Sequence, residues 1–259
     1  MRNSYFLFYL RNNLAAAMEY RFSFISQVMG MFINDTLWVI FWVMYFQKFP
    51  VLNGWTLNDL LVMWGSITFS FGLCFGFFWN VARLPELVVQ GQLDYYLGHP
   101  RGVLAHLAVS HLRPVNLGDC LFGPLLLLFF VPMTGTQWLL FFLTGVLAAL
   151  IYFSFYLTVG SLAFYLRNAE SVTGSVSTAI VHFSTYPTRI FEGWTRTLLF
   201  TVLPAGFISE VPVELVRNFR PELLGQMILA VAVYLGIALF VFHRGLKRYE
   251  SGNLILMQR

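Results

Sequence analysis

The longest stretch without a charged side chain constrains this chain more than any other feature. Residues 120–166 contain no Asp, Glu, Lys or Arg. As one helix this stretch would be about 70 Å long, whereas the hydrocarbon core of a bilayer is about 30 Å thick. We therefore expect two membrane-crossing helices joined by a turn. The turn is predicted at residues 132–137, which include Pro132 and Gly135.

The whole chain shares this apolar character. Of its 259 residues, 58% are hydrophobic and 11% are charged, whereas soluble domains carry about 25% charged residues. The apolar residues form long runs instead of alternating with polar ones, which favours helices over an outer-membrane barrel. The predicted fold class is an all-α integral membrane protein with about six transmembrane helices.

The distribution of apolar runs predicts one membrane domain over residues 1–259. Residues 83–114 are assigned to the cytoplasmic side and residues 189–222 to a re-entrant or extracellular segment. The predicted spans are residues 22–46, 60–82, 115–131, 138–166, 171–188 and 223–242.

Residues 1–21 have the pattern of an amphipathic helix lying at the membrane surface. Phe6, Tyr9 and Leu10 fall on one helical face, and Arg11 and Glu19 lie largely opposite. The alternative is a frayed N-terminal tail.

A short apolar piece precedes the last predicted span. Residues 197–209 are too few to cross as a helix, and they include Pro204 and Gly206. Non-helical backbone at membrane depth must be sheltered by protein or water. We therefore expect a re-entrant helical hairpin on the extracellular side.

The basic residues support this topology. With six spans and both termini in the cytoplasm, eleven of the 16 Lys and Arg residues fall on the cytoplasmic side, as the positive-inside rule requires. The basic residues flank apolar runs instead of forming one patch, so no nucleic-acid partner is expected.

Several signatures are missing from the sequence. It has no phosphate-binding loop and no metal-ligand spacing, so we expect no catalytic residues, no metal and no cofactor in this chain. Cys74 and Cys120 lie in apolar surroundings and are expected to be free thiols.

The predicted cytoplasmic region contains the most informative motif. Pro85 suits a helix start, and Gly91 permits a sharp bend between two short helices. Leu93, Tyr96 and Leu97 are expected to form one apolar face. Such a loop suits docking onto a partner, and the alternative is a helix lying on the membrane surface. The candidate docking residues are Glu86, Gly91, Leu93, Asp94, Leu97 and Pro100.

This motif, together with the helical surface segment and the six spans, resembles type-2 ABC exporter permeases. The segment before the last span is similar to the two short extracellular re-entrant helices of that family, and the tail from Gly245 to Ser251 is similar to that of a bacterial subgroup. By this resemblance, the docking residues form a coupling helix. The candidate extracellular gate residues are Tyr186, Pro187, Phe191, Pro204, Phe207 and Pro212.

The resemblance also implies partners. ATP and Mg would be bound by a separate ABC ATPase dimer, and a second permease would complete the pathway, with a heterodimer favoured over a homodimer. The complex would lie among the lipids of a bacterial inner (plasma) membrane. The cargo stays open among lipids, glycolipids, drugs and peptides.

Some residues within the spans are candidates for the pathway or for a subunit interface. Asn34 and Asp35 lie inside the first predicted span, where a carboxylate is costly; a structural hydrogen bond is the alternative. Gly72 and Gly76 form a small-residue face that could pack within the chain or between subunits. Most tryptophans are expected in lipid-facing positions and interface belts, including Trp38, Trp42, Trp55, Trp79, Trp138 and Trp194.

Two other classes of protein compete with this interpretation. A secondary transporter or channel would call for inverted repeats and several charges at the membrane midplane. An intramembrane enzyme would need convergent catalytic groups, for which His182 and Ser184 are weak candidates.

Overall fold

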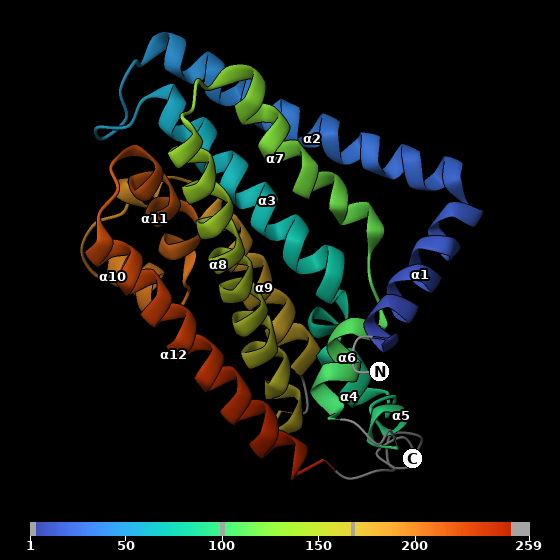
Figure 1. Ribbon diagram of the computed structural model, residues 1–259. Coiled ribbons are helices and arrows are strands. Elements are labelled where there is room, and N and C mark those ends of the chain that lie inside the picture. Colours follow the sequence, from blue (N-terminus) through green and yellow to red (C-terminus); the bar gives the residue numbers. More distant parts are fainter. Residues whose placement is uncertain (1–3, 99–101, 167–168, 250–259) are drawn as a thin grey trace.

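The computed structural model describes residues 4–98, 102–166 and 169–249, and its regular elements in these ranges are all helices (Figure 1). The prediction of an all-α chain is confirmed. The elements are α1 (Ser4–Glu19), α2 (Arg21–Lys48), α3 (Leu57–Ala82), α4 (Leu84–Val89), α5 (Asp94–Leu97), α6 (Val103–Ser110), η1 (Pro114–Asn116), α7 (Leu117–Phe130), α8 (Gly135–Gly160), η2 (Ser161–Phe164), α9 (Ala169–Ser184), η3 (Thr188–Ile190), α10 (Gly193–Thr201), α11 (Ala205–Arg217) and α12 (Pro221–Leu246).

Four of the helical stretches are long and apolar enough to cross a membrane. They are α2, α3 with α4, α8 with η2, and α12. Two bent pairs also pass the test of length and composition, α6 with η1 and α7 at 72° and α10 with α11 at 91°. The described residues therefore include four to six candidate spans, as a multi-pass membrane protein requires.

The predicted fifth span, residues 171–188, corresponds to a short helix. α9 has 16 residues, which is about 24 Å of helix, less than the roughly 30 Å hydrocarbon core. It is not among the candidate spans of the described residues. A count of six therefore depends either on α9 crossing with its flanking residues or on the bent α10–α11 pair crossing.

Capping explains where α8, which contains most of the predicted fourth span, begins. Pro132 lies between α7 and α8, and Thr134 caps α8. The Thr134 backbone N–H donates to Gln137 Oε1 at 2.8 Å, and the Gln137 N–H donates to Thr134 Oγ1 at 3.4 Å. This reciprocal pair satisfies two donors at the helix start. The helix break therefore falls within residues 132–137, where turn chemistry predicts it.

α3 is the central helix of the bundle. It packs against α7, α8 and α11, and it is far more buried than α2 or α12. Gly72 permits the close contact with α7, because a Cβ added there would lie 2.2 Å from the Cys120 backbone nitrogen. A Cβ at Gly76 would lie 2.6 Å from Leu117 Cδ2. The small-residue face thus packs within the chain.

The tryptophans are less exposed than expected. Trp55 is fully buried and Trp42 is 5% exposed, whereas Trp194 is 83% exposed. The prediction of a lipid-facing or interfacial belt is therefore wrong for Trp42 and Trp55. These rings fill the core where α2, α3 and the loop between them meet.

α1 packs against the end of the bundle that carries α6. Asn13 Nδ2 donates to the Ser110 carbonyl at 3.3 Å, and the Tyr9 ring lies edge-on to His106. Leu7 and Phe8 remain 59% and 61% exposed. One side of α1 therefore holds it to the bundle, and apolar side chains are left on its outer surface.

Candidate functional site

The first candidate site is the loop that joins α3 to α6. Pro85 lies in the first turn of α4, and Gly91 follows the end of that helix with φ +70°. This left-handed conformation favours glycine. The chain then turns into the single helical turn of α5, so two short helices with a bend at Gly91 are present.

A hydrogen-bond network fastens this loop to α3 and α6. Asn80 Nδ2, near the end of α3, lies 2.9 Å from Tyr96 Oη, 2.8 Å from Ser110 Oγ and 3.1 Å from the Leu107 carbonyl. Tyr96 Oη and Ser110 Oγ are themselves 2.9 Å apart. Because Asn80 is buried, water competes little for these bonds, and displacement of α5 must disturb the end of α3.

The expected apolar face of the loop is divided between two environments. Leu93 is fully buried and Tyr96 is 8% exposed, whereas Leu97 is 43% exposed. The prediction that all three form one face is therefore wrong. Leu93 and Tyr96 belong to the core between α4, α6 and α8, and Leu97 lies on the surface beside the exposed Tyr95.

The remaining docking candidates have different surroundings. Glu86 forms a bidentate ion pair with Arg83, in which Arg83 Nε donates to Oε2 at 3.0 Å and Arg83 Nη2 donates to Oε1 at 3.1 Å. Asp94 begins α5 and is exposed. Pro100 lies outside the described residues.

The second candidate site is an ionic cluster on the segment before α12. Glu210 of α11 is 5% exposed and accepts from Thr188 Oγ1 at 2.5 Å, Arg189 Nε at 3.2 Å and Arg196 Nη2 at 2.8 Å. Glu214 pairs with Arg189 at 2.7 Å and with Arg220 at 3.3 Å. The second carboxylate of the cluster is therefore Glu214.

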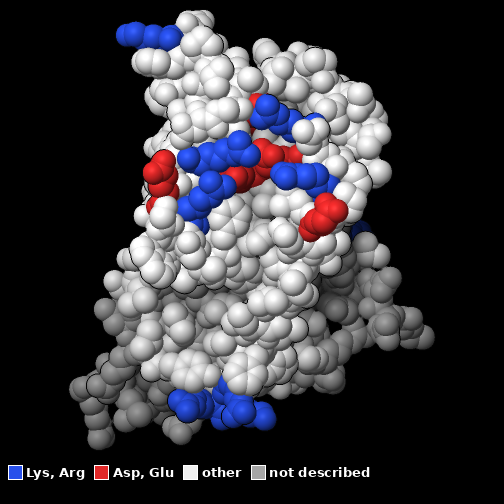
Figure 2. All heavy atoms as spheres, turned by 90° about the vertical axis from the view of Figure 1, so that its left-hand side faces the viewer, with Lys and Arg blue, Asp and Glu red and all other residues white. Residues whose placement is uncertain are grey.

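The cluster also reaches the loop between α2 and α3. Arg217 Nη1 lies 3.6 Å from Asp59 Oδ2 and donates to the Gly54 carbonyl, and Asn53 donates to the Arg189 carbonyl. Figure 2 views the side of the molecule that lies on the left in Figure 1. Charged side chains gather toward one end of this side, and a basic group lies at the other end. The broad area between them has no Lys, Arg, Asp or Glu. Such a distribution is typical of a membrane-embedded surface.

The gate candidates lie between the end of α9 and the end of α11, some of them where one helix ends and the next begins. Tyr186 and Pro187 follow α9, and the Tyr186 ring lies 6.2 Å from Trp38 and 6.4 Å from Trp42 of α2. Pro204 lies at the bend between α10 and α11. The other three make internal contacts or lie within a helix: Phe191 against Phe183, Phe207 against Phe200, and Pro212 inside α11.

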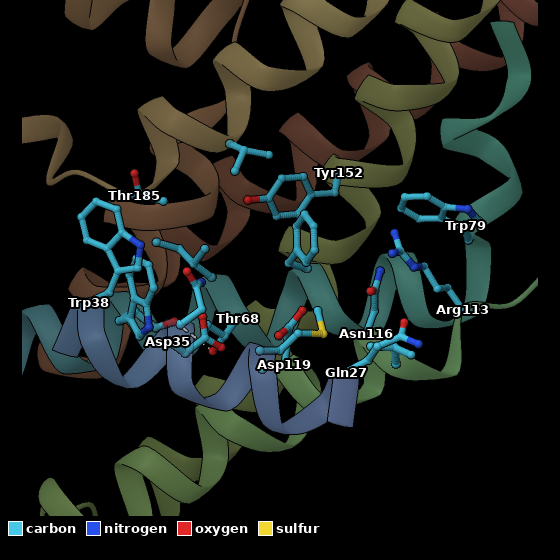
Figure 3. Close-up of a pocket in the computed structure, with 18 of the residues that line it drawn as sticks. Gln27, Asp35, Trp38, Thr68, Trp79, Arg113, Asn116, Asp119, Tyr152 and Thr185 are labelled. Atoms are coloured by element: carbon cyan, nitrogen blue, oxygen red, sulfur yellow. Dashed lines mark hydrogen bonds between the residues drawn. The ribbon is translucent and has the colours of Figure 1, made fainter. Parts of the chain in front are cut away.

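The third candidate site is a cavity of about 570 Å³. It lies between α2, α3, α7, α8 and α9, and its wall includes the pathway candidates Asn34 and Asp35 (Figure 3). The rings of Trp38 and Trp64 form part of the wall, and Asp119 of α7 also lines the cavity. Gly72 and Gly76 are absent from the wall, since they face α7.

Arg113 also lines this cavity. Its guanidinium lies 4.5 Å from the centre of the Trp79 ring, an arrangement that stabilises the cation. Among the described residues no ion pair within 4 Å joins Arg113 to Asp119.

Several residues that were not among the candidates from the sequence also form part of these three sites. Asn80 has a weak sequence signal, as a polar residue within an apolar run. Glu214 shares a face of α11 with Glu210, because helix neighbours recur every three to four residues. The positions of Tyr152 and Asn116 in the cavity wall have no local sequence signal.

In comparisons with known proteins, residues 32–252 match one family model, which is described as ABC-2 family transporter protein. Neither the search of curated proteins nor the search of solved structures found a match. Because the matched region covers most of the 259 residues, the chain belongs to the ABC-2 family of transporter proteins and is a permease component of an ABC transporter.

Proposed function

We propose that this permease works as an ATP-driven exporter together with a separate ABC ATPase dimer and a second permease, which we expect to be a different chain. ATP and Mg would be held by the ATPase subunits. The observation that carries the proposal is the α4–α5 loop, whose hydrogen bonds to the end of α3 provide a stiff link between a surface loop and the central membrane helix.

The exposed part of this loop is the proposed docking surface. Tyr95 and Leu97 are 61% and 43% exposed, and Gln92 is exposed beside them. A partner that binds these side chains would move α5. Through Tyr96 and Asn80 the displacement would reach α3, which packs against most of the bundle.

Leu97→Arg tests this docking surface. The substitution places a charge where the ATPase would bury an apolar side chain, so we expect at least a tenfold weaker stimulation of ATPase activity by the permease, with transport lost in parallel. The measurement is ATP hydrolysis by the reconstituted complex. Val51→Arg is the matched control, because Val51 is 60% exposed in the α2–α3 loop. Normal stimulation by Leu97→Arg would exclude the docking site.

The segment 188–220 is proposed as a re-entrant gate. Its beginning and its end share one ionic cluster, since Arg189 pairs with Glu214, and Glu214 pairs with Arg220. A segment whose two ends are bonded together returns to the side on which it started, so α9 and α12 would be the adjacent spans. Contacts of Tyr186 with Trp38 and Trp42 would close the outer end of the cavity.

α9 supports the proposed second permease. Ser171, Ser175 and Thr178 are exposed on this helix, and their spacing places them along one face with His182, which lines the cavity. Ser175 and Thr178 donate to carbonyls of their own helix, which leaves their oxygen atoms as acceptors along this face. Such a polar face would suit an aqueous pathway shared with another subunit.

A further inference from the structure

The cavity between α2 and α9 has an excess of acidic groups. Its described wall contains two carboxylates, Asp35 and Asp119, but one guanidinium, Arg113. Arg113 lies over Trp79 and within electrostatic range of Asp119. With both carboxyl groups ionised and His182, the one imidazole of the described wall, neutral, one negative charge remains without a counter-charge.

Asp35 is the group that lacks a partner most clearly. It is 6% exposed, and its Oδ2 atom has no hydrogen-bond partner, although Asn34 offers the carboxylate a side-chain hydrogen bond. Figure 3 shows Asp35 and Asp119 at the cavity, on helices α2 and α7. A charge left unpaired in a membrane helix is costly and marks a functional position.

The wall beside Asp35 is aromatic. The rings of Trp38 and Trp64 are 5.5 Å apart and inclined by 32°, and both line the cavity. Tryptophan faces attract cations through the ring quadrupole, and the attraction increases when the cation is desolvated. The carboxylate and these two rings therefore favour the same kind of ligand group.

We propose that this cavity binds a monovalent organic cation, an amine or quaternary ammonium compound with an apolar or aromatic body, whose charged nitrogen lies beside Asp35. The proposal rests on the proposed function, since it names the class of cargo for the pathway. The volume of about 570 Å³ is that of a drug-sized ligand site.

A pair of probes with nearly equal shape and opposite charge tests the proposal. Tetraphenylphosphonium is a monocation, and tetraphenylborate is the matching anion. Binding of each is measured by equilibrium dialysis against the purified full chain in one non-ionic detergent. We expect Asp35→Asn to weaken binding of the phosphonium at least tenfold and to leave borate binding unchanged or stronger.

Two further variants separate charge from folding. Asp35→Glu keeps the charge and should bind the phosphonium within about threefold of the wild type, because carboxylate–cation attraction depends weakly on a small displacement. Glu19→Gln removes an exposed carboxylate of α1 and should bind as the wild type does. All variants are compared by size-exclusion profile and thermal midpoint.

Three results would overturn the proposal. They are no phosphonium binding by the wild type, equal phosphonium binding by Asp35→Asn and wild type, or an equal loss of phosphonium and borate binding in Asp35→Asn. None of these measurements uses an ATPase. Failure of the coupling test with Leu97→Arg would therefore leave the result on the cavity intact, and the reverse also holds.

Discussion

At the scale of single residues, Gly72 shows how closely two helices of this bundle approach. The backbone of α7 lies where a side chain at position 72 would have to be, and a Cβ there would be 2.7 Å from the Asn116 carbonyl oxygen as well as 2.2 Å from the Cys120 nitrogen. Neither neighbour is the end of a flexible side chain, so the helices themselves would have to separate. Close approach through small residues is a common way for membrane helices to associate.

Gly72→Ala is therefore expected to lower the free energy of unfolding by about 1–3 kcal/mol, the usual cost of overpacking. The measurement is thermal unfolding of the purified chain in detergent, followed by tryptophan fluorescence. Gly225→Ala is the matched control, because a Cβ at Gly225 in α12 meets nothing within 4 Å. Alanine is the better helix former by about 1 kcal/mol, so this control should be neutral or slightly stabilising. Equal losses in the two variants would contradict the assigned contact.

At the scale of elements, one carboxylate joins the two helices of the bent α10–α11 pair to each other and to η3. Glu210 accepts hydrogen bonds from η3 through Thr188 and from α10 through Arg196. The side chain of Glu210 is 7% exposed and that of Arg196 is 46% exposed. One buried acceptor thus connects three consecutive elements, in addition to the Arg189–Glu214 pair and the contact between Phe200 and Phe207.

Glu210→Ala should loosen this segment without unfolding the bundle. We expect local opening to become easier by about 1–2 kcal/mol, toward the lower part of the range for hydrogen bonds to charged groups because the arginines are partly exposed. Hydrogen exchange of the backbone between residues 188 and 217 should accelerate about tenfold. Glu192→Ala, at an exposed carboxylate of the same segment, should leave exchange unchanged. Protection retained in Glu210→Ala would show that packing, rather than the ionic cluster, holds the segment.

At the scale of the whole molecule, the two ends of the bundle are chemically different. α1, the α4–α5 loop, α6 and the C-terminal end of α12 gather at one end, and the α2–α3 loop lies with α10 and α11 toward the other (Figure 1). Basic residues Arg244, Lys247 and Arg248 lie at or after the end of α12. By the positive-inside rule we expect this end to face the cytoplasm.

Cysteine labelling in sealed cells tests this orientation. Val51→Cys in the α2–α3 loop should react with a membrane-impermeant maleimide added outside, and Gln92→Cys should react only after permeabilisation, since both positions are exposed but lie at opposite ends. The wild-type chain controls for background labelling, because Cys74 is buried and Cys120 is partly buried. Labelling of Gln92→Cys from outside would reverse the orientation, and equal access to both positions would contradict the separation of the two ends.

The class of protein, the helix break within residues 132–137, the bend at Gly91 and the family could all be predicted from the amino-acid sequence. Apart from the family, which rests on the order of several motifs along the chain, these features depend on local properties: the length of an apolar run, a capping pair, or a backbone angle that glycine adopts easily. The distinction between a membrane protein and a soluble one follows from the length and frequency of apolar runs.

Which side chains meet could not be predicted in this way and is known from the three-dimensional structure. It brought Asp35, Asp119 and Arg113 to one cavity, put Leu93 in the core while Leu97 stayed on the surface, and buried Trp42 and Trp55. It also directed Gly72 toward α7 instead of another subunit. The physical reason is that these outcomes depend on the rotation and register of one helix against another, and many distant contacts set these together. A nearly uniform apolar sequence leaves the rotation of each helix weakly specified, since most of its faces are about equally hydrophobic.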